Sequence, residues 1–347
     1  MLRVAIAGYG TVGKIRHQCI DGYPDAQVVA VADSSLNAGQ ISQEIRGYSD
    51  SHVMLETVKP DVLFIALPNY LSGKLTIDAL QHGSHVFCEK PPARNLIELN
   101  KVLEAEIRNP GLHLTYGFNH RFHPSVKMAL ELVESGQLGD LIDMRGVYGK
   151  SAIIRYNSSE WRCQRDLAGG GILLDQGIHM VDMMRLMAGD FEEIHSFVSN
   201  SHWRHDVEDN AYAIMRTGAG VVAMIHSSAT QWRHRFQLDI TLTKGSITLT
   251  GILSSTRSYG AETITVATST PDLLGEPNEV TTRFSSDTSW QEETNDFLHA
   301  VQSGIDPTSS SSQHALKTME VVYAIYDADP VWFAKYGTDW STSQAGK

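Results

Sequence analysis

Short runs of β-branched and other apolar residues alternate with longer segments of helical character as far as residue 118. Runs that are apolar on both faces are typical of buried strands in a parallel sheet. Strands connected through helices in this order predict right-handed crossovers and an α/β architecture. The predicted strands are Leu2–Ala7, Val28–Ala32, Val62–Leu67, His85–Cys88 and His113–Phe118, and the predicted helices are Val12–Asp21, Gly73–Gln81 and Asn95–Glu106.

The pattern changes after Asn119. Helical segments are now followed by strand-like segments of alternating polarity, with glycine-containing turns at 217–220 and 244–245. This order predicts one α/β domain, 1–119, and an α+β domain, 120–347, with a large and mostly antiparallel sheet. The second domain's predicted helices are Pro124–Ser135, Gly171–Met187, Gln291–Ser303 and Ser312–Ala328, and its predicted strands are Ile194–Ser199, Asn210–Arg216, Val221–Ser227, Phe236–Thr243 and Ser246–Thr250.

The composition is that of a globular protein, with 42% hydrophobic and 20% charged residues. A net charge of -12 repels nucleic acid and anionic membranes, so we expect neither as a partner. The three cysteines, Cys19, Cys88 and Cys163, have no CxxC spacing and indicate neither a disulfide framework nor a metal site. We find no secretory signal and no membrane-spanning run, and we expect a cytoplasmic protein.

The first motif with a chemical meaning is Gly8-Tyr9-Gly10-Thr11-Val12-Gly13, which fits G-x-G-x-x-G between a predicted strand and a predicted helix. The glycines allow a tight turn, close approach of a pyrophosphate and close packing of the helix, whose free N–H groups face the phosphates. Asp33, followed by Ser34, ends the second strand 20 residues after Gly13. Its carboxylate would bind a ribose diol and repel a 2′-phosphate. The sequence therefore predicts a Rossmann domain that binds NAD rather than NADP.

Two further segments carry titratable groups in unusual settings. Cys88-Glu89-Lys90-Pro91-Pro92 follows the fourth strand, at the sheet edge where α/β proteins bind ligands, and the prolines stiffen the loop that presents Lys90. Asp175 and His179 stand four residues apart after three glycines, on one face of a predicted helix. The plainer alternatives are a surface lysine and an intrahelical Asp–His pair in which Asp182 is a second partner for His179.

Taken together, these segments resemble the Gfo/Idh/MocA family of oxidoreductases, which includes glucose-fructose oxidoreductase and inositol dehydrogenases. The resemblance spans nearly the whole chain, and the EKP motif combined with the D-x-G-x-H helix makes it specific. It rests on Gly8–Gly13 with Arg16-His17, Asp33, Leu67-Pro68-Asn69, Glu89-Lys90-Pro91, Gly117-Phe118-Asn119-His120-Arg121-Phe122, Trp161-Arg162 and the segment 169–182.

The resemblance implies that Lys90 lies near the nicotinamide and the reacting carbon, and that Asp175 and His179 complete the site from the second domain. His179 would be the usual acid/base, and Lys90 would assist it or share that task. The cofactor would be lined by Glu89 and Asn119 and by the loop Leu67, Pro68 and Asn69. Tyr70, where many members have His, and Pro92, where an aliphatic residue is commoner, depart from the family pattern.

Basic residues near the second motif suggest the substrate. A nucleotide-linked or acidic sugar would suit this cluster, because the guanidinium of an arginine can bind a phosphate or carboxylate through two hydrogen bonds. The residues are Arg121, His123, Arg155, Arg162 and Arg165, together with the aromatic Trp161. The string from Phe118 to Pro124 and the pair Trp161-Arg162 ahead of the glycines are similar to members that oxidise nucleotide-linked sugars. Alternatively, these arginines pair with acids such as Glu160 and Asp166, and the substrate is a free polyol such as inositol. A dinucleotide-sensing regulator without catalysis is the alternative from another class. The family also implies a homodimer or homotetramer, and no metal is expected.

Overall fold

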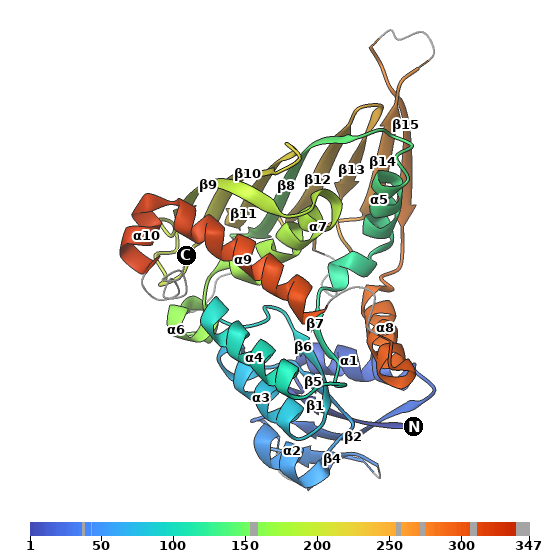
Figure 1. Ribbon diagram of the computed structural model, residues 1–347, viewed down its shortest axis with the longest axis vertical. Coiled ribbons are helices and arrows are strands. Elements are labelled where there is room, and N and C mark those ends of the chain that lie inside the picture. The colour runs from blue at the N-terminus through green and yellow to red at the C-terminus, as the bar shows by residue number, and fades with distance from the viewer. Residues whose placement is uncertain are drawn as a thin grey trace. The chain divides into compact units, whose positions relative to one another are not determined.

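The computed structural model describes residues 1–36, 39–42, 44–152, 159–254, 258–270, 275–305 and 311–337. Its chain divides into two compact units (Figure 1). Unit 1 comprises Met1–Asn119, Asp166–Gly169 and Ser289–Leu316, and unit 2 comprises His120–Arg165, Gly170–Thr288 and Lys317–Lys347. The single division after residue 119 that the sequence suggests is thus one of several crossings between the units.

Unit 1 is built on a seven-stranded sheet with the order β3-β4-β2-β1-β5-β6-β7. All neighbouring strands are parallel except β3 and β4. The parallel α/β arrangement predicted from the alternating pattern is confirmed. The strands are β1 Leu2–Ala7, β2 Ala26–Ala32, β3 Gly39–Gln40, β4 Arg46–Tyr48, β5 Val62–Ile65, β6 His85–Glu89 and β7 Leu114–Gly117.

Helices flank this sheet, and Figure 1 shows α3 and α4 side by side and α8 next to α1. They are α1 Thr11–Asp21, α2 Ser51–Val58, α3 Asn69–Gln81, α4 Leu96–Arg108 and α8 Ser289–Ser303. Helix α8 joins this unit because Phe297 completes an aromatic cluster with Phe64 and Phe87, at ring-centroid distances of 5.6 and 5.4 Å. Burial of these rings is what ties so distant a segment of the chain to the sheet.

Unit 2 contains an eight-stranded sheet with the order β15-β14-β13-β12-β8-β11-β10-β9. Only the β8–β11 pair is parallel among its neighbours, so the predicted mostly antiparallel sheet is confirmed. The strands are β8 Leu141–Ser151, β9 Phe191–Ser199, β10 Asn210–Thr217, β11 Val222–Gln231, β12 Arg235–Leu242, β13 Gly245–Thr250, β14 Glu262–Thr268 and β15 Asn278–Phe284.

Helices α5 Pro124–Glu134 and α7 Ile178–Ala188 pack against this sheet (Figure 1). The remaining helices are the four-residue α6 Arg165–Ala168, α9 Ser312–Ala328 and α10 Pro330–Tyr336. The predicted single helix over 171–187 is wrong in one detail, since a π-helical turn, Leu173–Gly177, precedes α7. Asp175 lies in this wider turn and His179 in the α-helix, so the two do not share a regular i, i+4 spacing on one α-helix.

Candidate active site

The turn between β1 and α1 has the geometry that a dinucleotide requires. Gly8 has a φ of +88°, and a Cβ there would lie 2.3 Å from the carbonyl oxygen of Ala66. A Cβ on Gly13 would lie 2.0 Å from the carbonyl oxygen of Gly8, which only glycine avoids. Gly10, the N-cap of α1, has open space in front of it and no side-chain cap. The first N–H groups of α1 are therefore available for a pyrophosphate.

Asp33 follows β2 and binds the same turn. One carboxylate oxygen accepts the backbone N–H of Tyr9 at 2.9 Å, and the other accepts the backbone N–H and hydroxyl of Ser35. Partial burial alone would raise the pKa of Asp33, but the hydrogen bonds from Ser35 and Tyr9 outweigh it and hold the pKa below its usual value. The carboxylate is therefore ionised and oriented, while the adjacent Ser34 is exposed.

Lys90 is half-buried and comes directly after β6, joined to Pro91 by a cis peptide bond. The residue before it, Glu89, is fixed by Arg16 of α1, whose Nε lies 2.7 Å from Oε1 of Glu89. Arg16 is itself buried, and its Nη2 lies 2.5 Å from Oε2 of Glu293 in α8. Glu89, expected to line the cofactor, thus anchors the start of the loop that presents Lys90.

The remaining predicted cofactor residues lie near the carboxyl ends of the strands. Leu67 and Pro68 connect β5 to α3, and Asn69 begins α3 and donates from its side chain to the carbonyl oxygen of Ala168 at 2.7 Å. Asn119 is buried after β7, and its side-chain amide lies 3.1 Å from the hydroxyl of Ser289. These loops share one edge of the sheet with the glycine turn, because parallel strands end there together.

In unit 2, the segment that leads into Asp175 and His179 is held by a buried carboxylate that no sequence motif indicated, that of Glu208. Glu208 accepts the backbone N–H groups of Gly171 and Leu173 at 2.7 and 2.9 Å. Burial raises the pKa of Glu208 above its usual value, against the hydrogen bonds it accepts. No pattern in the sequence marks this residue, because its partners are more than 30 positions away.

The imidazole of His179 lies against that of His120, with ring centroids 3.7 Å apart and an interplanar angle of 13°. His120 Nε2 is 2.9 Å from the hydroxyl of Tyr148 in β8. Burial raises the pKa of Tyr148 well above its usual value, with smaller contributions from Tyr259 and Asp175. In the sequence, His120 is marked only by its position between Asn119 and Arg121 in the segment Gly117–Phe122.

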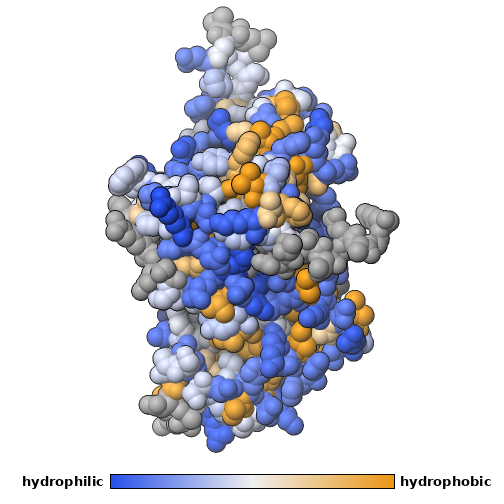
Figure 2. Space-filling model, turned by 90° about the vertical axis from the view of Figure 1, so that its left-hand side faces the viewer, coloured by the Kyte–Doolittle hydropathy of each residue, from blue (hydrophilic) through white to orange (hydrophobic). Residues whose placement is uncertain are grey.

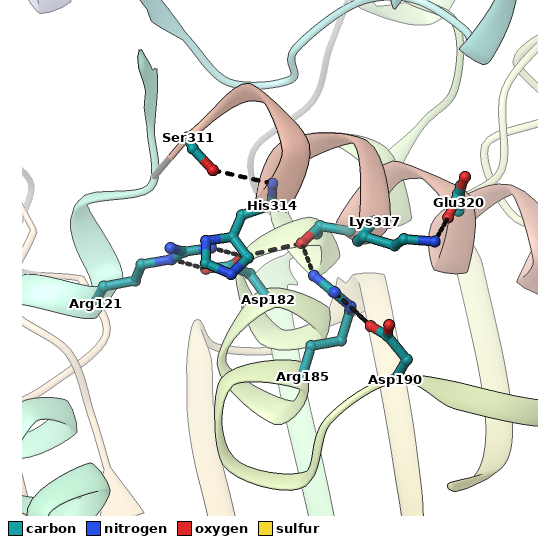
Figure 3. Close-up of polar contacts among 9 residues, drawn as sticks. Arg121, Asp182, Arg185, Asp190, Ser311, His314, Lys317 and Glu320 are labelled. Atoms are coloured by element: carbon teal, nitrogen blue, oxygen red, sulfur yellow. Dashed lines mark hydrogen bonds and ion pairs between the residues drawn. The ribbon is translucent and has the colours of Figure 1, made fainter. Parts of the chain in front are cut away.

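Arg121 forms a bidentate ion pair with Asp182 of α7, with nitrogen–oxygen distances of 2.6 and 2.5 Å (Figure 3). Asp182 also accepts the hydroxyl of Thr318, and Thr318 in turn accepts Arg185, which pairs with Asp190. Arg121 and Asp182 are both buried. The acid that pairs with Arg121 is therefore Asp182, rather than Glu160 or Asp166. Asp182, which the sequence offered as a second partner for His179, forms its ion pair with Arg121 instead.

The other basic residues near the second motif differ in exposure. Arg162 is exposed and stacks over the ring of Trp161, with 4.3 Å between its guanidinium carbon and the ring centroid. Arg165 is buried, stacks over Tyr336 and donates to the carbonyl oxygen of Asp206 at 2.9 Å. Arg155 lies outside the described residues.

No group of three or more His, Cys, Asp or Glu side chains is placed to hold a metal ion within the described ranges. In the same ranges, none of the helices combines the length and the apolar character needed to cross a bilayer.

Two family models match the chain. Residues 2–118 match the oxidoreductase family with an NAD-binding Rossmann fold, and residues 126–248 match the GFO/IDH/MocA C-terminal domain. Both matches agree with the resemblance seen in the sequence. The first unit is therefore an NAD-binding domain, as its glycine turn indicates.

Among curated proteins, D-glucoside 3-dehydrogenase of Escherichia coli is 36% identical over 195 residues, which are 54% of each chain. Myo-inositol 2-dehydrogenase of Thermotoga maritima is 28% identical and covers 65% of this chain and 68% of its own. The match spans about half the length of the first relatives, 54% for the E. coli protein and 46% for levoglucosan dehydrogenase of Pseudarthrobacter phenanthrenivorans.

Solved structures share the fold over nearly the full length. Levoglucosan dehydrogenase in complex with NADH has a TM-score of 0.81 at 23% identity, covering 95% of this chain and 97% of its own. An aldose-aldose oxidoreductase from Caulobacter crescentus has a TM-score of 0.77 at 22% identity, covering 94% and 97%.

Proposed function

Because the chain belongs to the Gfo/Idh/MocA family of oxidoreductases, we propose that it transfers a hydride between NAD and a secondary hydroxyl or ketone group of a sugar. The observation that carries this proposal is the turn after β1. It combines open space at Gly10, an uncapped helix start and the ionised Asp33, which are the features that a pyrophosphate and a ribose diol need. Bound NAD supplies the hydride acceptor or donor.

The chemistry that we assign to the chain is proton transfer and charge stabilisation. When the alcohol is oxidised, its carbon loses a hydride to the nicotinamide and its hydroxyl loses a proton to the protein. We assign the proton to His179, which acts as a neutral imidazole. The ammonium of Lys90 stabilises the developing alkoxide, and Asp175 orients the acid/base. Exchange of the roles of Lys90 and His179 is the alternative mechanism.

We propose a free, uncharged sugar or polyol as the substrate. Arg121 is committed to Asp182, and Arg165 is held by Asp206 and Tyr336, so neither guanidinium is presented for a phosphate or carboxylate. The relatives are named for a glucoside and for myo-inositol. A nucleotide-linked or acidic sugar is the second candidate, favoured by the exposed Arg162 beside Trp161.

The test is a panel of substrates with the wild-type protein and NAD. The panel contains D-glucose, a methyl glucoside, levoglucosan and myo-inositol, with UDP-glucose and glucuronate as anionic counterparts. We expect NADH formation with at least one free sugar, at a higher kcat/KM than with its anionic counterpart. NAD binding without turnover of any compound would favour the dinucleotide-sensing regulator instead.

We further propose that the protein forms a homodimer or homotetramer through the outer face of its second sheet. Exposed hydrophobic side chains line neighbouring strands there: Phe197, Tyr212, Ile214, Val222 and Met224. Tyr212 is opposite Phe197, and Ile214 is opposite Met224. Figure 2 shows hydrophobic residues grouped in the upper part of one face, with hydrophilic residues around them. Sedimentation of an Ile214→Glu/Met224→Glu variant should give a smaller species than the wild type.

A further inference from the structure

His179, in the first turn of α7, and His120, in the short 3-10 turn Asn119–Phe122 that follows β7, form a tight stack whose purpose the assigned chemistry does not explain. The ring centroids of His120 and His179 are 3.7 Å apart and the rings are nearly parallel, at 13°. The two residues are 7% and 4% exposed, so both rings are removed from water. The N–H bonds of an imidazole lie in the plane of its ring. Rings stacked in this way therefore do not pass a proton directly from one to the other.

His120 is itself held in place from its far edge. Its Nε2 is 2.9 Å from the hydroxyl of Tyr148, whose ring packs edge-on against Phe236 at a centroid distance of 5.4 Å. Because burial raises the pKa of Tyr148 well above its usual value, the phenol keeps its proton. The edge of His123 also packs against His120, at a centroid distance of 5.4 Å.

His123 is fixed in turn. Its Nδ1 lies 2.8 Å from Oε2 of Glu262, and both side chains are fully buried. The other carboxylate oxygen of Glu262 accepts the backbone N–H of Ser125, in the first turn of α5. His120 is thus bounded by neighbours from β8, β12 and the start of α5, and the ring of His179 lies against one face of its imidazole.

We infer that His120 is a positioning residue: its ring, anchored by Tyr148, is the surface that fixes the plane of the His179 imidazole during proton transfer. This inference rests on the proposed function, in which His179 is the acid/base. Rotation of an imidazole about its last bond changes the direction of its nitrogen lone pair. A small loss of alignment at the reacting atoms costs much rate while leaving substrate affinity almost unchanged.

Three variants distinguish the contribution of the His120 ring from the contribution of its hydrogen bond to Tyr148. His120→Phe keeps a flat ring and loses the contact to Tyr148, whereas His120→Asn keeps a polar group and loses the ring. His120→Ala loses both. We expect kcat to fall by about 10²-fold in the Ala and Asn variants and by less than about tenfold in the Phe variant. The KM of the sugar and the Kd of NAD should change by less than about threefold, because the ring contacts neither in this assignment.

His113 provides a matched control. It stacks on His85 with a centroid distance of 5.3 Å and an angle of 22°, at the amino ends of β6 and β7, away from the glycine turn. His113→Ala should leave kcat unchanged. The inference is overturned if His120→Ala keeps the wild-type kcat, or if the Phe variant loses as much as the Asn variant, which would assign the effect to the hydrogen bond.

A readout that does not need turnover separates this inference from the proposed function. In histidine-labelled full-length protein, the Hε1 resonance of His179 is identified by its loss in His179→Gln. It should move downfield in His120→Ala and much less in His120→Phe, because a proton over the face of a ring is shielded. An unmoved resonance in folded His120→Ala overturns the inference, even if no sugar is oxidised. Absence of turnover in the wild type, with the expected shift present, contradicts only the proposed function. If His120→Ala does not fold, the comparison of kcat between His120→Phe and His120→Asn tests the inference.

Discussion

The Nε of Arg16 donates a hydrogen bond to Oε1 of Glu89 at 2.7 Å, which joins the helix after the glycine turn to the strand end before Lys90. The guanidinium also lies 4.3 Å from the ring centroid of Phe87 and 4.5 Å from that of Trp290. The carboxylates of Glu89 and Glu293 raise the pKa of Arg16 against the effect of burial, so the charge is retained. One buried cation thus connects the two loops assigned to the cofactor and to catalysis.

Replacement of this cation should destabilise the protein strongly. Arg16→Met leaves the carboxylates of Glu89 and Glu293 without their partner in a poorly hydrated site, and a broken buried pair costs about 3–5 kcal/mol. Chemical denaturation followed by fluorescence measures the free energy of unfolding. Arg108→Met is the control, because Arg108 and Glu104 form an exposed pair, 73% and 61% accessible, worth at most about 1 kcal/mol. Equal losses in the two variants would contradict this account.

Cofactor choice should depend on Asp33. We expect NAD(H) to bind more tightly than NADP(H), because the ionised carboxylate accepts from a ribose diol and repels a 2′-phosphate. Asp33→Ala should narrow the preference by about tenfold or more, as a hydrogen bond to a charged group contributes roughly 1.5–3 kcal/mol. Titration of both cofactors against the wild type, the variant and an exposed-site control, Asp25→Ala, measures this. Tighter binding of NADP(H) by the wild type would refute it.

The lowered pKa of Asp33 fixes the sign of the pH dependence. A carboxylate is charged above its pKa, so the preference for NAD should persist unchanged from pH 8 to pH 6.5. Below about pH 6 the 2′-phosphate itself begins to take up its second proton, and the repulsion should weaken for that reason. A preference that disappears between pH 8 and 7 would show that a group other than Asp33 sets it.

Glu208 should support both stability and turnover. Glu208→Gln keeps one acceptor oxygen but turns an NH2 group toward one of the two N–H donors, that of Gly171 or that of Leu173, so we expect the free energy of unfolding to fall by about 2–3 kcal/mol and kcat to fall by roughly tenfold. Tyr326→Phe, which removes one donor to the same carboxylate, should lose less. Denaturation and steady-state kinetics measure the two effects. A Gln variant that matches the wild type in both would remove Glu208 from the account.

The pH dependence of this effect has a definite direction. Burial raises the folded-state pKa of Glu208 above the unfolded value, so the folded protein binds a proton more tightly in the interval between them. By linkage, the stability that Glu208 contributes is largest below the unfolded pKa and declines as the pH rises through the folded pKa. The difference in unfolding free energy between wild type and Glu208→Gln should therefore grow on acidification from pH 7 to pH 5. If this difference in unfolding free energy shrinks on acidification, the folded-state pKa of Glu208 lies below its unfolded value and the account is contradicted.

Much of the fold could be predicted because its local signals agree. The buried parallel strands, the glycine turn and Asp33 lie where the pattern placed them. Strand β8 was missed, although it lies in the middle of its sheet, because Gly146 and Gly149 break its pattern. A Cβ on Gly146 would lie 2.6 Å from the sulfur of Met180 in α7. The glycine is needed for close helix packing, which a local reading cannot detect.

The candidate site was predicted less completely. The residue types of the motifs indicated Lys90, Asp175 and His179, but their supports come from distant segments. Arg121 was expected to contact substrate, yet it pairs with Asp182, which is 61 positions away. Glu208 carries no local pattern at all. A single sequence reports where a polar residue stands and does not report which buried partner it meets.

The measurement that tests the central claim most directly is single-turnover hydride transfer by Lys90→Met with an accepted sugar. We expect the variant to fold and to bind NAD with wild-type affinity, since the turn at Gly8–Gly13 is untouched. The rate of transfer should fall by about 10²–10³-fold, the scale of losing one positioned transition-state donor. Lys90→Arg should not restore it fully, because a planar guanidinium cannot replace a compact ammonium. A transfer rate unchanged in Lys90→Met would contradict the proposed site.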